Sequence, residues 1–166
     1  MLMLKSSLHS PHKKVYVHNA LTQEICCLFD GQKEIGSFDA SANIKELRIL
    51  GNTPMLEVAS AVALELYGET YIPSHDLFDN VSSLYSPSKN TLEPYNYTAF
   101  GEELFLEKTS PWRFSSKRTD EETGLVYYGK RYYCSSIGRF LTPDPIGLEA
   151  GSNLYQYVFN NPFQYT

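Results

Sequence analysis

The sequence has 166 residues, of which 42% are hydrophobic and 20% are charged, and its formal net charge is −5. This length corresponds to one ordinary domain or to part of a larger one, and the apolar content excludes a wholly disordered chain. The sequence contains no apolar run of roughly 18 residues, which a membrane-spanning helix needs, and no basic cluster of the kind that binds nucleic acid.

Residues 1–14 show no periodicity and are predicted to be a loose N-terminal tail. The histidines in and near this segment match no metal-binding spacing. Of the three cysteines, Cys26 and Cys27 are adjacent and Cys134 is distant, which fits neither a disulfide framework nor a zinc site. We therefore expect reduced thiols and neither a metal nor another cofactor.

Short strand-like segments follow the tail. Thirteen tyrosines and an aromatic content of 14% favour strands and hairpins over long helices. Strands are expected at 15–17, 24–29, 34–38 and 44–50. The pair Asp30-Gly31 between the second and third of these is a strong hairpin signal.

Residues 54–66 permit two interpretations. Pro54 near the start, together with many Ala and Leu residues, favours a helix. The alternation of large apolar with small or charged residues between 61 and 66 favours a strand instead. Tyr67-Gly68 then predicts a turn into a returning strand at 69–73. The residues alone leave both interpretations open.

An internal repeat links two of the expected turns. The pattern aromatic-Asp-x-x-x-Asn-[Ile/Val]-x-x-Leu occurs at 38–47 and again at 75–84, an offset of 37 residues (75 − 38). Asp39 and Asp76 each stand at a strand end, where a carboxylate accepts hydrogen bonds from the backbone amides of a turn. The repeat predicts a serial hairpin meander that continues into the Tyr-rich strand at 95–97.

The second half carries a series of spaced motifs. In chain order they are Trp112-Arg113-Phe114, D-x-x-T-G-L from Asp120 to Leu125, Arg131-Tyr132-Tyr133, Gly138-Arg139-Phe140, Asp144-Pro145-Ile146-Gly147, Asn153-Leu154-Tyr155-x-Tyr157 and Asn160-Asn161-Pro162. Together they resemble the repeat-associated core domain of the Rhs (rearrangement hotspot, YD-repeat) family over about residues 99–166. Residues 25–97 resemble degenerate YD repeats.

The resemblance implies an all-β fold, in which a serial β-hairpin meander forms a strip of an Rhs/YD-repeat shell, with short irregular or helical pieces near the C-terminus. It implies a tail at 1–14, degenerate repeat hairpins at 15–98 and a core domain at 99–166, and it favours strands within 54–66. In this family the shell encloses a variable C-terminal toxin and the core domain plugs one end. The toxin is cut off after a D-P-x-G-L sequence by a site that resembles an aspartyl protease.

The resemblance places one catalytic acid at Asp144 and the second at Asp120, with Glu121 or Glu122 as alternatives to Asp120. Such a site needs one ionised carboxylate to activate water and one protonated carboxyl, which two acids about 3 Å apart provide because both cannot ionise together. The residues also permit a plainer interpretation. Asp144-Pro145 is an ordinary turn opener, and Asp120 belongs to a turn in which acids are usually solvated.

The sequence departs from the family pattern in three places. Cys134-Ser135 stands where the family motif R-Y-Y-D-P has Asp-Pro. Ala42 and Asp79 stand where the repeats have a turn glycine, a change that costs Ala roughly 1 kcal/mol in a left-handed conformation. The sequence ends at Thr166, where the family pattern would continue into D-P-x-G-L, so we expect the scissile bond to be absent.

The resulting hypothesis is a structural fragment or end-plug of an Rhs-type toxin-encapsulating shell, without activity of its own. One alternative is an autoproteolytic, aspartyl-protease-like core domain that releases a C-terminal toxin in a longer parent chain. Another is a surface adhesion or carbohydrate-binding module that uses exposed tyrosines.

The expected partners are the remaining shell or the toxin of a parent protein, together with further copies of the chain that pair through exposed sheet edges. Neither nucleic acid nor a membrane span is expected. The N-terminus lacks the apolar region of a signal peptide. The sequence leaves the final location open. We expect the chain to be cytoplasmic as made, and the resemblance to a bacterial family allows export by a dedicated secretion system as part of a larger protein.

Overall fold

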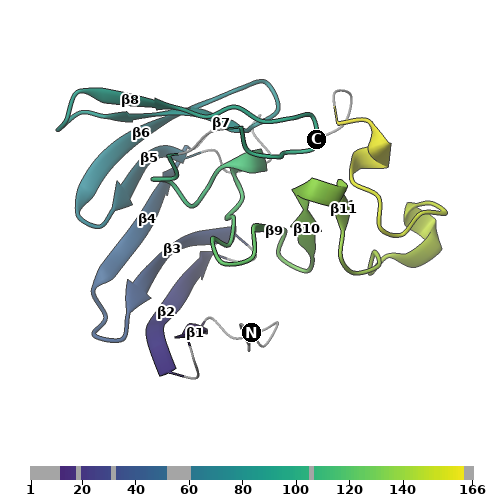
Figure 1. Ribbon diagram of the computed structural model, residues 1–166, viewed down its shortest axis with the longest axis horizontal. Helices are drawn as coiled ribbons and strands as arrows, with labels where there is room; N and C mark the ends of the chain where they lie inside the picture. The colour runs from purple at the N-terminus through teal and green to yellow at the C-terminus, as the bar shows by residue number, and fades with distance from the viewer. Residues whose placement is uncertain (1–11, 18–19, 31–32, 52–60, 105–106, 163–166) are drawn as a thin grey trace.

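The computed structural model describes residues 12–17, 20–30, 33–51, 61–104 and 107–162. Eight antiparallel strands form one sheet whose spatial order is the chain order (Figure 1). Their bounds are β1 His12–Val17, β2 Ala20–Asp30, β3 Lys33–Asp39, β4 Ile44–Leu50, β5 Ala61–Leu66, β6 Glu69–His75, β7 Val81–Ser86 and β8 Thr91–Pro94. The prediction of an all-β hairpin meander is confirmed.

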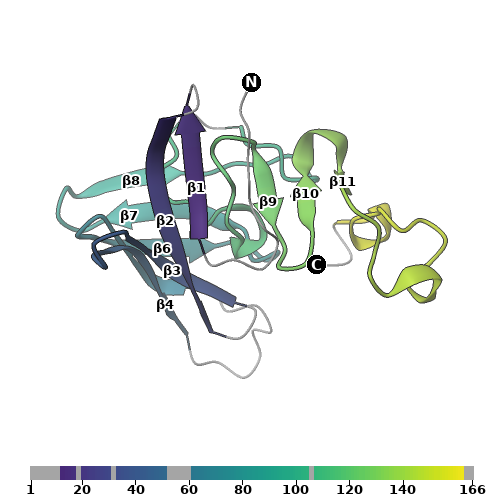
Figure 2. The same ribbon diagram turned by 90° about the horizontal axis from the view of Figure 1, so that it is seen from below.

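The second half contains a smaller sheet and several short 3-10 turns, in agreement with the expected short helical pieces. The sheet has the order β11-β10-β9, and its strands are β9 Leu125–Tyr127, β10 Tyr132–Cys134 and β11 Arg139–Phe140. The turns are η1 Phe114–Ser116, η2 Ser135–Ile137, η3 Gly147–Ala150 and η4 Val158–Asn160. Figures 1 and 2 show this half on one side of the large sheet. None of the helices in the described residues is long and apolar enough to cross a membrane.

Neighbouring strands pair where the sequence predicted hairpins. Asp30 pairs with Lys33, so β2 and β3 are joined at the expected Asp-Gly position. Tyr67 and Gly68 join β5 to β6 and have φ values of 54° and 85°. Positive φ at both loop positions gives a turn whose twist matches that of the flanking strands, which explains why a glycine stands at 68.

The two turns of the predicted repeat have the same hydrogen bonds. The Asp39 carboxylate accepts from the amides of Ser41 and Asn43 at 2.9 and 3.0 Å. The Asp76 carboxylate accepts from the corresponding amides of Phe78 and Asn80 at 2.8 and 2.9 Å. In both turns the Asn carbonyl accepts from the Asp backbone amide, so the sequence repeat is a structural repeat.

A third turn of the same type begins at Thr98. Its backbone amide donates to the Glu102 carbonyl, and its hydroxyl accepts from the Glu102 amide at 3.1 Å. The fourth position of this turn is Gly101, with φ of 83°, whereas Ala42 and Asp79 occupy that position in the other two turns with φ of 62° and 58°. The left-handed conformation expected where the repeat glycines are missing is therefore present.

Asp39 is expected to make stability depend on pH. The Asn43 amide and the Lys45 ammonium, whose nitrogen lies 3.0 Å from the carboxylate, hold the pKa of Asp39 well below its usual 3.8. A carboxylate with a lowered folded-state pKa stabilises the fold above its unfolded pKa and loses that contribution as pH falls. We expect the urea midpoint of the wild type to fall more than that of Asp39→Asn between about pH 7 and about pH 2. If the urea midpoints of the wild type and of Asp39→Asn fell equally, the role of Asp39 in pH-dependent stability would be contradicted.

Within 54–66, the structure forms the strand β5 from Ala61 to Leu66, and residues 54–60 lie outside the described part. Leu64 and Leu66 are buried and Glu65 between them is exposed, as a strand with one buried face requires. The strand interpretation is therefore correct for the described residues of this segment.

The first strand starts earlier than the sequence suggested. β1 begins at His12, so it includes the last three residues of the segment predicted as a tail, whose residues 1–11 lie outside the described part. Lys13 and Lys14 pair with Ile25 and Glu24 of β2 at the edge of the sheet. Edge strands often carry lysine, and such a strand lacks the apolar alternation that sequence analysis detects.

Two apolar clusters hold the fold together. The first lies against the sheet and contains Ala61, Leu64, Leu66, Tyr71, Val81, Leu84, Tyr95 and Trp112. The second lies within the C-terminal half and contains Phe114, Val126, Tyr133, Phe140 and Tyr157. The half-buried Tyr97 packs against both clusters, and its hydroxyl donates to the Val81 carbonyl at 2.8 Å. The C-terminal half is therefore packed onto the sheet.

Candidate functional site

A buried cluster of charges joins the second half to the sheet. Arg118 donates from Nε to Glu34 of β3 at 2.5 Å, and from Nη2 to Glu46 of β4. Ser37, the cross-strand neighbour of Glu46, donates its hydroxyl to the same carboxylate at 2.6 Å. Glu34 and Glu46 are only 7% and 4% exposed. We call Arg118, Glu34 and Glu46 the charge clamp.

The clamp is buried, and its charges depend on one another. Burial raises the pKa of Glu34, and Arg118 opposes that rise. Burial lowers the pKa of Arg118, but the two glutamates outweigh this effect and the pKa is raised overall. The guanidinium carbons of Arg118 and Arg48 lie 5.0 and 5.3 Å from the ring centroid of Trp112, within cation–π range. Burial lowers the pKa of Arg48 to about 10.

A second buried arginine orders the loops that precede the small sheet. Arg113 is fully buried and donates to Glu103 at 2.6 Å, to the Ser110 carbonyl at 2.8 Å and to Glu121. Burial lowers its pKa, but the acidic partners more than offset this and raise it. Glu121, one alternative for the second catalytic acid, therefore binds Arg113 in this structure.

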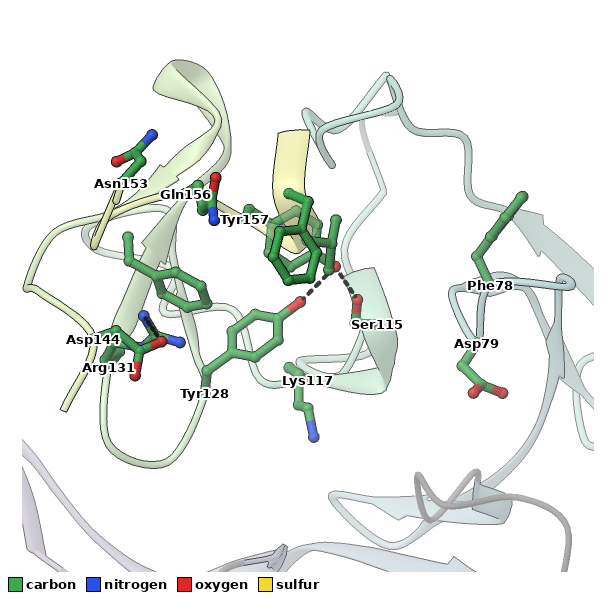
Figure 3. Close-up of a pocket in the computed structure, with 13 residues that line it drawn as sticks. Phe78, Asp79, Ser115, Lys117, Tyr128, Arg131, Asp144, Asn153, Gln156 and Tyr157 are labelled. Carbon is green, nitrogen blue, oxygen red and sulfur yellow. Dashed lines mark hydrogen bonds and ion pairs between the residues drawn. The ribbon is translucent and has the colours of Figure 1, made fainter. Parts of the chain in front are cut away.

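A cavity of about 270 Å³ lies between the sheet and the C-terminal segments (Figure 3). It combines aromatic, amide and charged side chains. Its lining residues are Phe78, Asp79, Ser115, Lys117, Tyr128, Arg131, Phe140, Asp144, Asn153, Gln156, Tyr157, Val158 and Phe159. Among the predicted catalytic residues, the cavity contains Asp144.

Asp144 opens a turn and forms an ion pair. Its carboxylate accepts from the Ile146 amide at 3.0 Å, and its carbonyl accepts from the Gly147 amide at 2.9 Å. The other carboxylate oxygen lies 2.9 Å from Arg131, whose guanidinium carbon is 3.7 Å from the ring centroid of Phe140. Because the Asp144 side chain is only 15% exposed, this ion pair is well shielded from water.

Asp120 stands in a different turn, at the start of β9. Its carboxylate accepts from the Thr123 hydroxyl at 2.6 Å, and its carbonyl accepts from the Gly124 amide at 2.7 Å. Asp120 does not line the cavity that contains Asp144, and Glu122 is exposed. The two predicted acids thus stand in separate turns, and their catalytic roles stay predictions.

Hydrogen-bonded hydroxyl groups form part of the cavity wall, which sequence analysis did not reveal. Tyr128 donates to the Tyr157 hydroxyl at 3.1 Å, and Ser115 and Tyr157 share a hydrogen bond of 3.0 Å (Figure 3). Burial raises the pKa of Tyr128 well above its usual value. The N-L-Y-x-Y motif signalled Tyr157, but its partners lie 29 and 42 residues away in the sequence.

None of the cysteines in the described residues forms a disulfide. Cys134, which replaces the Asp of the family motif, lies 3.2 Å from the Ser136 hydroxyl at the start of η2. Within the described ranges, no group of three or more His, Cys, Asp or Glu side chains is arranged to hold a metal ion.

Sequence comparison finds relatives among bacterial toxin proteins. The chain is 52% identical over 54 residues to the toxin subunit YenC2 of Yersinia entomophaga, a match that covers 32% of this chain and 6% of YenC2. It is 34% identical over 104 residues to the tRNA3(Ser)-specific nuclease WapA of Bacillus spizizenii, over 57% of this chain and 4% of WapA. YibJ of Escherichia coli is 50% identical over 48 residues, which cover 29% of this chain and 21% of YibJ.

Solved structures of toxin complexes have the same fold. The TcdB2–TccC3 structure without its hypervariable C-terminal region aligns with a TM-score of 0.63 and 23% identity, over 91% of this chain and 8% of that one. A Photorhabdus luminescens Tc holotoxin pore, with an aspartate-to-alanine mutation in TccC3, aligns with a TM-score of 0.58 and 20% identity, over 99% of this chain and 9% of that one.

The chain spans about a fifth or less of the length of these relatives. No family model matches it. The shared sequence stretches nevertheless come from Rhs-type toxin proteins, and the sheet has the fold of the Tc toxin shell. The chain is therefore similar in sequence to parts of Rhs-type toxin proteins and similar in fold to the Tc toxin shell.

Proposed function

We propose that this chain is a structural segment of an Rhs-type toxin-encapsulating shell, in which the sheet is a strip of the wall and the C-terminal half is the plug at one end. The charge clamp is the observation that supports this most. A buried ion pair stabilises little compared with apolar packing, but its geometry favours one arrangement of the two parts. We infer that the charge clamp fixes the position of the plug relative to the wall.

The division of the chain into repeats at 15–98 and a core domain at 99–166 is part of this proposal. The third repeat turn, at 98–102, lies across that boundary. The turn geometry of the wall thus continues into the first residues of the plug. This continuity suits a plug that forms as the last element of the wall rather than a separately folded domain.

An exchange experiment tests the structural role. The segment of TcdB2–TccC3 that aligns with this chain would be replaced by residues 1–166, and the particles would be examined by electron microscopy. We expect closed particles, and we expect open or aggregated ones when the inserted segment carries Arg118→Ala. Particles that stay open with the wild-type insert would contradict the proposal.

A second candidate function, self-cleavage in a longer parent chain, is favoured by one observation. Asp144 lines a cavity and pairs with Arg131, an arrangement that suits one carboxyl group of an aspartyl-type site. Because Asp120 stands in another turn, this proposal places the chemistry on Asp144. It applies to a parent protein in which a cleavable segment follows this one.

Appending Asp-Pro-x-Gly-Leu and a reporter protein after Thr166 tests this candidate. If Asp144 acts as the acid–base group, the reporter is released, and Asp144→Asn slows its release at least about a hundredfold. Asp120→Asn is the matched control and should release the reporter at the wild-type rate. Absence of release, or release that Asp144→Asn leaves unchanged, would remove this candidate.

A further inference from the structure

The chain makes a left-handed turn immediately after the aromatic core of the plug. Val158, Phe159 and Asn160 have φ values of 40°, 55° and 56°. Such values are uncommon for residues other than glycine, and a β-branched residue such as Val158 adopts them only under strain. The amides of Asn160 and Asn161 donate to the carbonyls of Tyr157 and Val158 at 2.8 and 3.0 Å and close the turn.

Tyr157 anchors this turn to the rest of the plug. Its side chain is only 5% exposed, and its ring centroid lies 4.5 Å from that of Tyr133. Its hydroxyl bonds to the Ser115 hydroxyl at 3.0 Å and accepts from Tyr128 at 3.1 Å. Val158 packs against the same aromatic cluster, whereas the side chain of Phe159 is 63% exposed. The aromatic cluster therefore holds Val158, the first residue of the strained turn.

Ser115 connects the anchor to the wall. Its backbone amide donates to the side-chain oxygen of Asn80, in the second repeat turn, at 2.8 Å. The neighbouring Ser116 hydroxyl donates to the Asp79 carbonyl of that turn at 2.7 Å. Ser115 and Ser116 are themselves left-handed, with φ of 49° and 51°. A continuous hydrogen-bonded path thus runs from the repeat turn through Ser115 and Tyr157 to the strained turn.

We propose that the turn Val158–Asn160 is a strained joint, which the hydroxyl bridge between Ser115 and Tyr157 holds closed, and that residues 158–162 change direction when the bridge opens. Backbone strain favours opening, and the bridge opposes it. The inference goes beyond the structural role proposed above. It makes residues 158–162 a movable segment of the plug, whose position depends on contact with the wall.

Hydrogen exchange of the full chain tests the bridge. Tyr157→Phe and Ser115→Ala each remove one hydroxyl and should speed exchange of the Asn160 and Asn161 amides about three- to tenfold, the factor that corresponds to one net hydrogen bond. Tyr155→Phe is the matched control, because the Tyr155 hydroxyl forms no hydrogen bond with the described residues, and it should leave the rates unchanged.

A second pair of variants tests the strain itself. Phe159→Asn and Phe159→Ala both remove the exposed ring, but asparagine tolerates a left-handed conformation better than alanine. We expect the same two amides to exchange about threefold more slowly in the asparagine variant. Equal amide exchange rates in the Phe159→Asn and Phe159→Ala variants would contradict the proposed joint. So would a Tyr157→Phe variant that exchanges like the wild type, or one in which β5 and β6 lose protection to the same extent as the turn.

Discussion

Replacing Arg118 with alanine is expected to lower the free energy of unfolding by about 3–5 kcal/mol, because it leaves two buried carboxylates without their positive partner. Glu34 and Glu46 are 7% and 4% exposed, so water cannot replace the lost ion pairs without opening the contact between plug and wall. Urea unfolding followed by circular dichroism measures this change. A loss below about 1 kcal/mol, the range of a surface ion pair, would mean that the clamp is solvated.

A triple variant controls for the loss of side-chain volume. Arg118→Met combined with Glu34→Gln and Glu46→Gln leaves no buried charge, so it should recover most of the stability that the alanine variant loses. In Arg118→Ala the carboxyl of Glu34, whose pKa burial already raises, becomes easier to protonate in the folded state. A carboxyl whose pKa is raised in the folded state destabilises the fold less as pH falls. The loss of unfolding free energy in Arg118→Ala should therefore be smaller near about pH 5 than near about pH 8.

Replacing Tyr133 with alanine is expected to lower the free energy of unfolding by about 3–5 kcal/mol, the range for removing a large aromatic side chain from a core. Tyr133 is fully buried, and its ring centroid lies within 6.0 Å of those of Phe114, Tyr128, Phe140 and Tyr157. The same urea titration measures the effect. A small loss would mean that the aromatic cluster is not a close-packed core.

Tyr133→Phe separates packing from hydrogen bonding at this position. The Tyr133 hydroxyl donates to the Phe100 carbonyl at 2.7 Å. Phenylalanine keeps the ring and removes only this bond, so the expected loss is about 1 kcal/mol. If the phenylalanine and alanine variants were equally unstable, the hydrogen bond and not the packing would hold the second core.

Local features of the fold could be predicted because their causes lie within a few residues. The turns at Asp39 and Asp76 were predicted from spacing alone, since each carboxylate binds amides two and four residues away. The equivalent turn at Thr98 has the same geometry but was missed, because a hydroxyl performs the role of the carboxylate there. Position 144 was foreseen as a turn opener for the same local reason.

The contacts that position the candidate site could not be predicted from the sequence. Arg118 binds glutamates 84 and 72 residues away, and a charged residue in a loop usually indicates a solvated surface. The distance between Asp120 and Asp144 depends on how two turns sit on a three-stranded sheet, which spacing along the chain does not determine. The early start of β1 was missed because edge strands can be polar.

The docking of the plug on the wall is tested most directly through Trp112, the only tryptophan in the sequence. Trp112 is 1% exposed and belongs to the cluster against the sheet. A urea titration would follow its emission, which reports the plug, and the far-ultraviolet circular dichroism, which reports the sheet. We predict blue-shifted native emission and coincident transitions, as for one cooperative unit. Emission typical of exposed tryptophan, or an emission change that precedes loss of the sheet, would contradict the account.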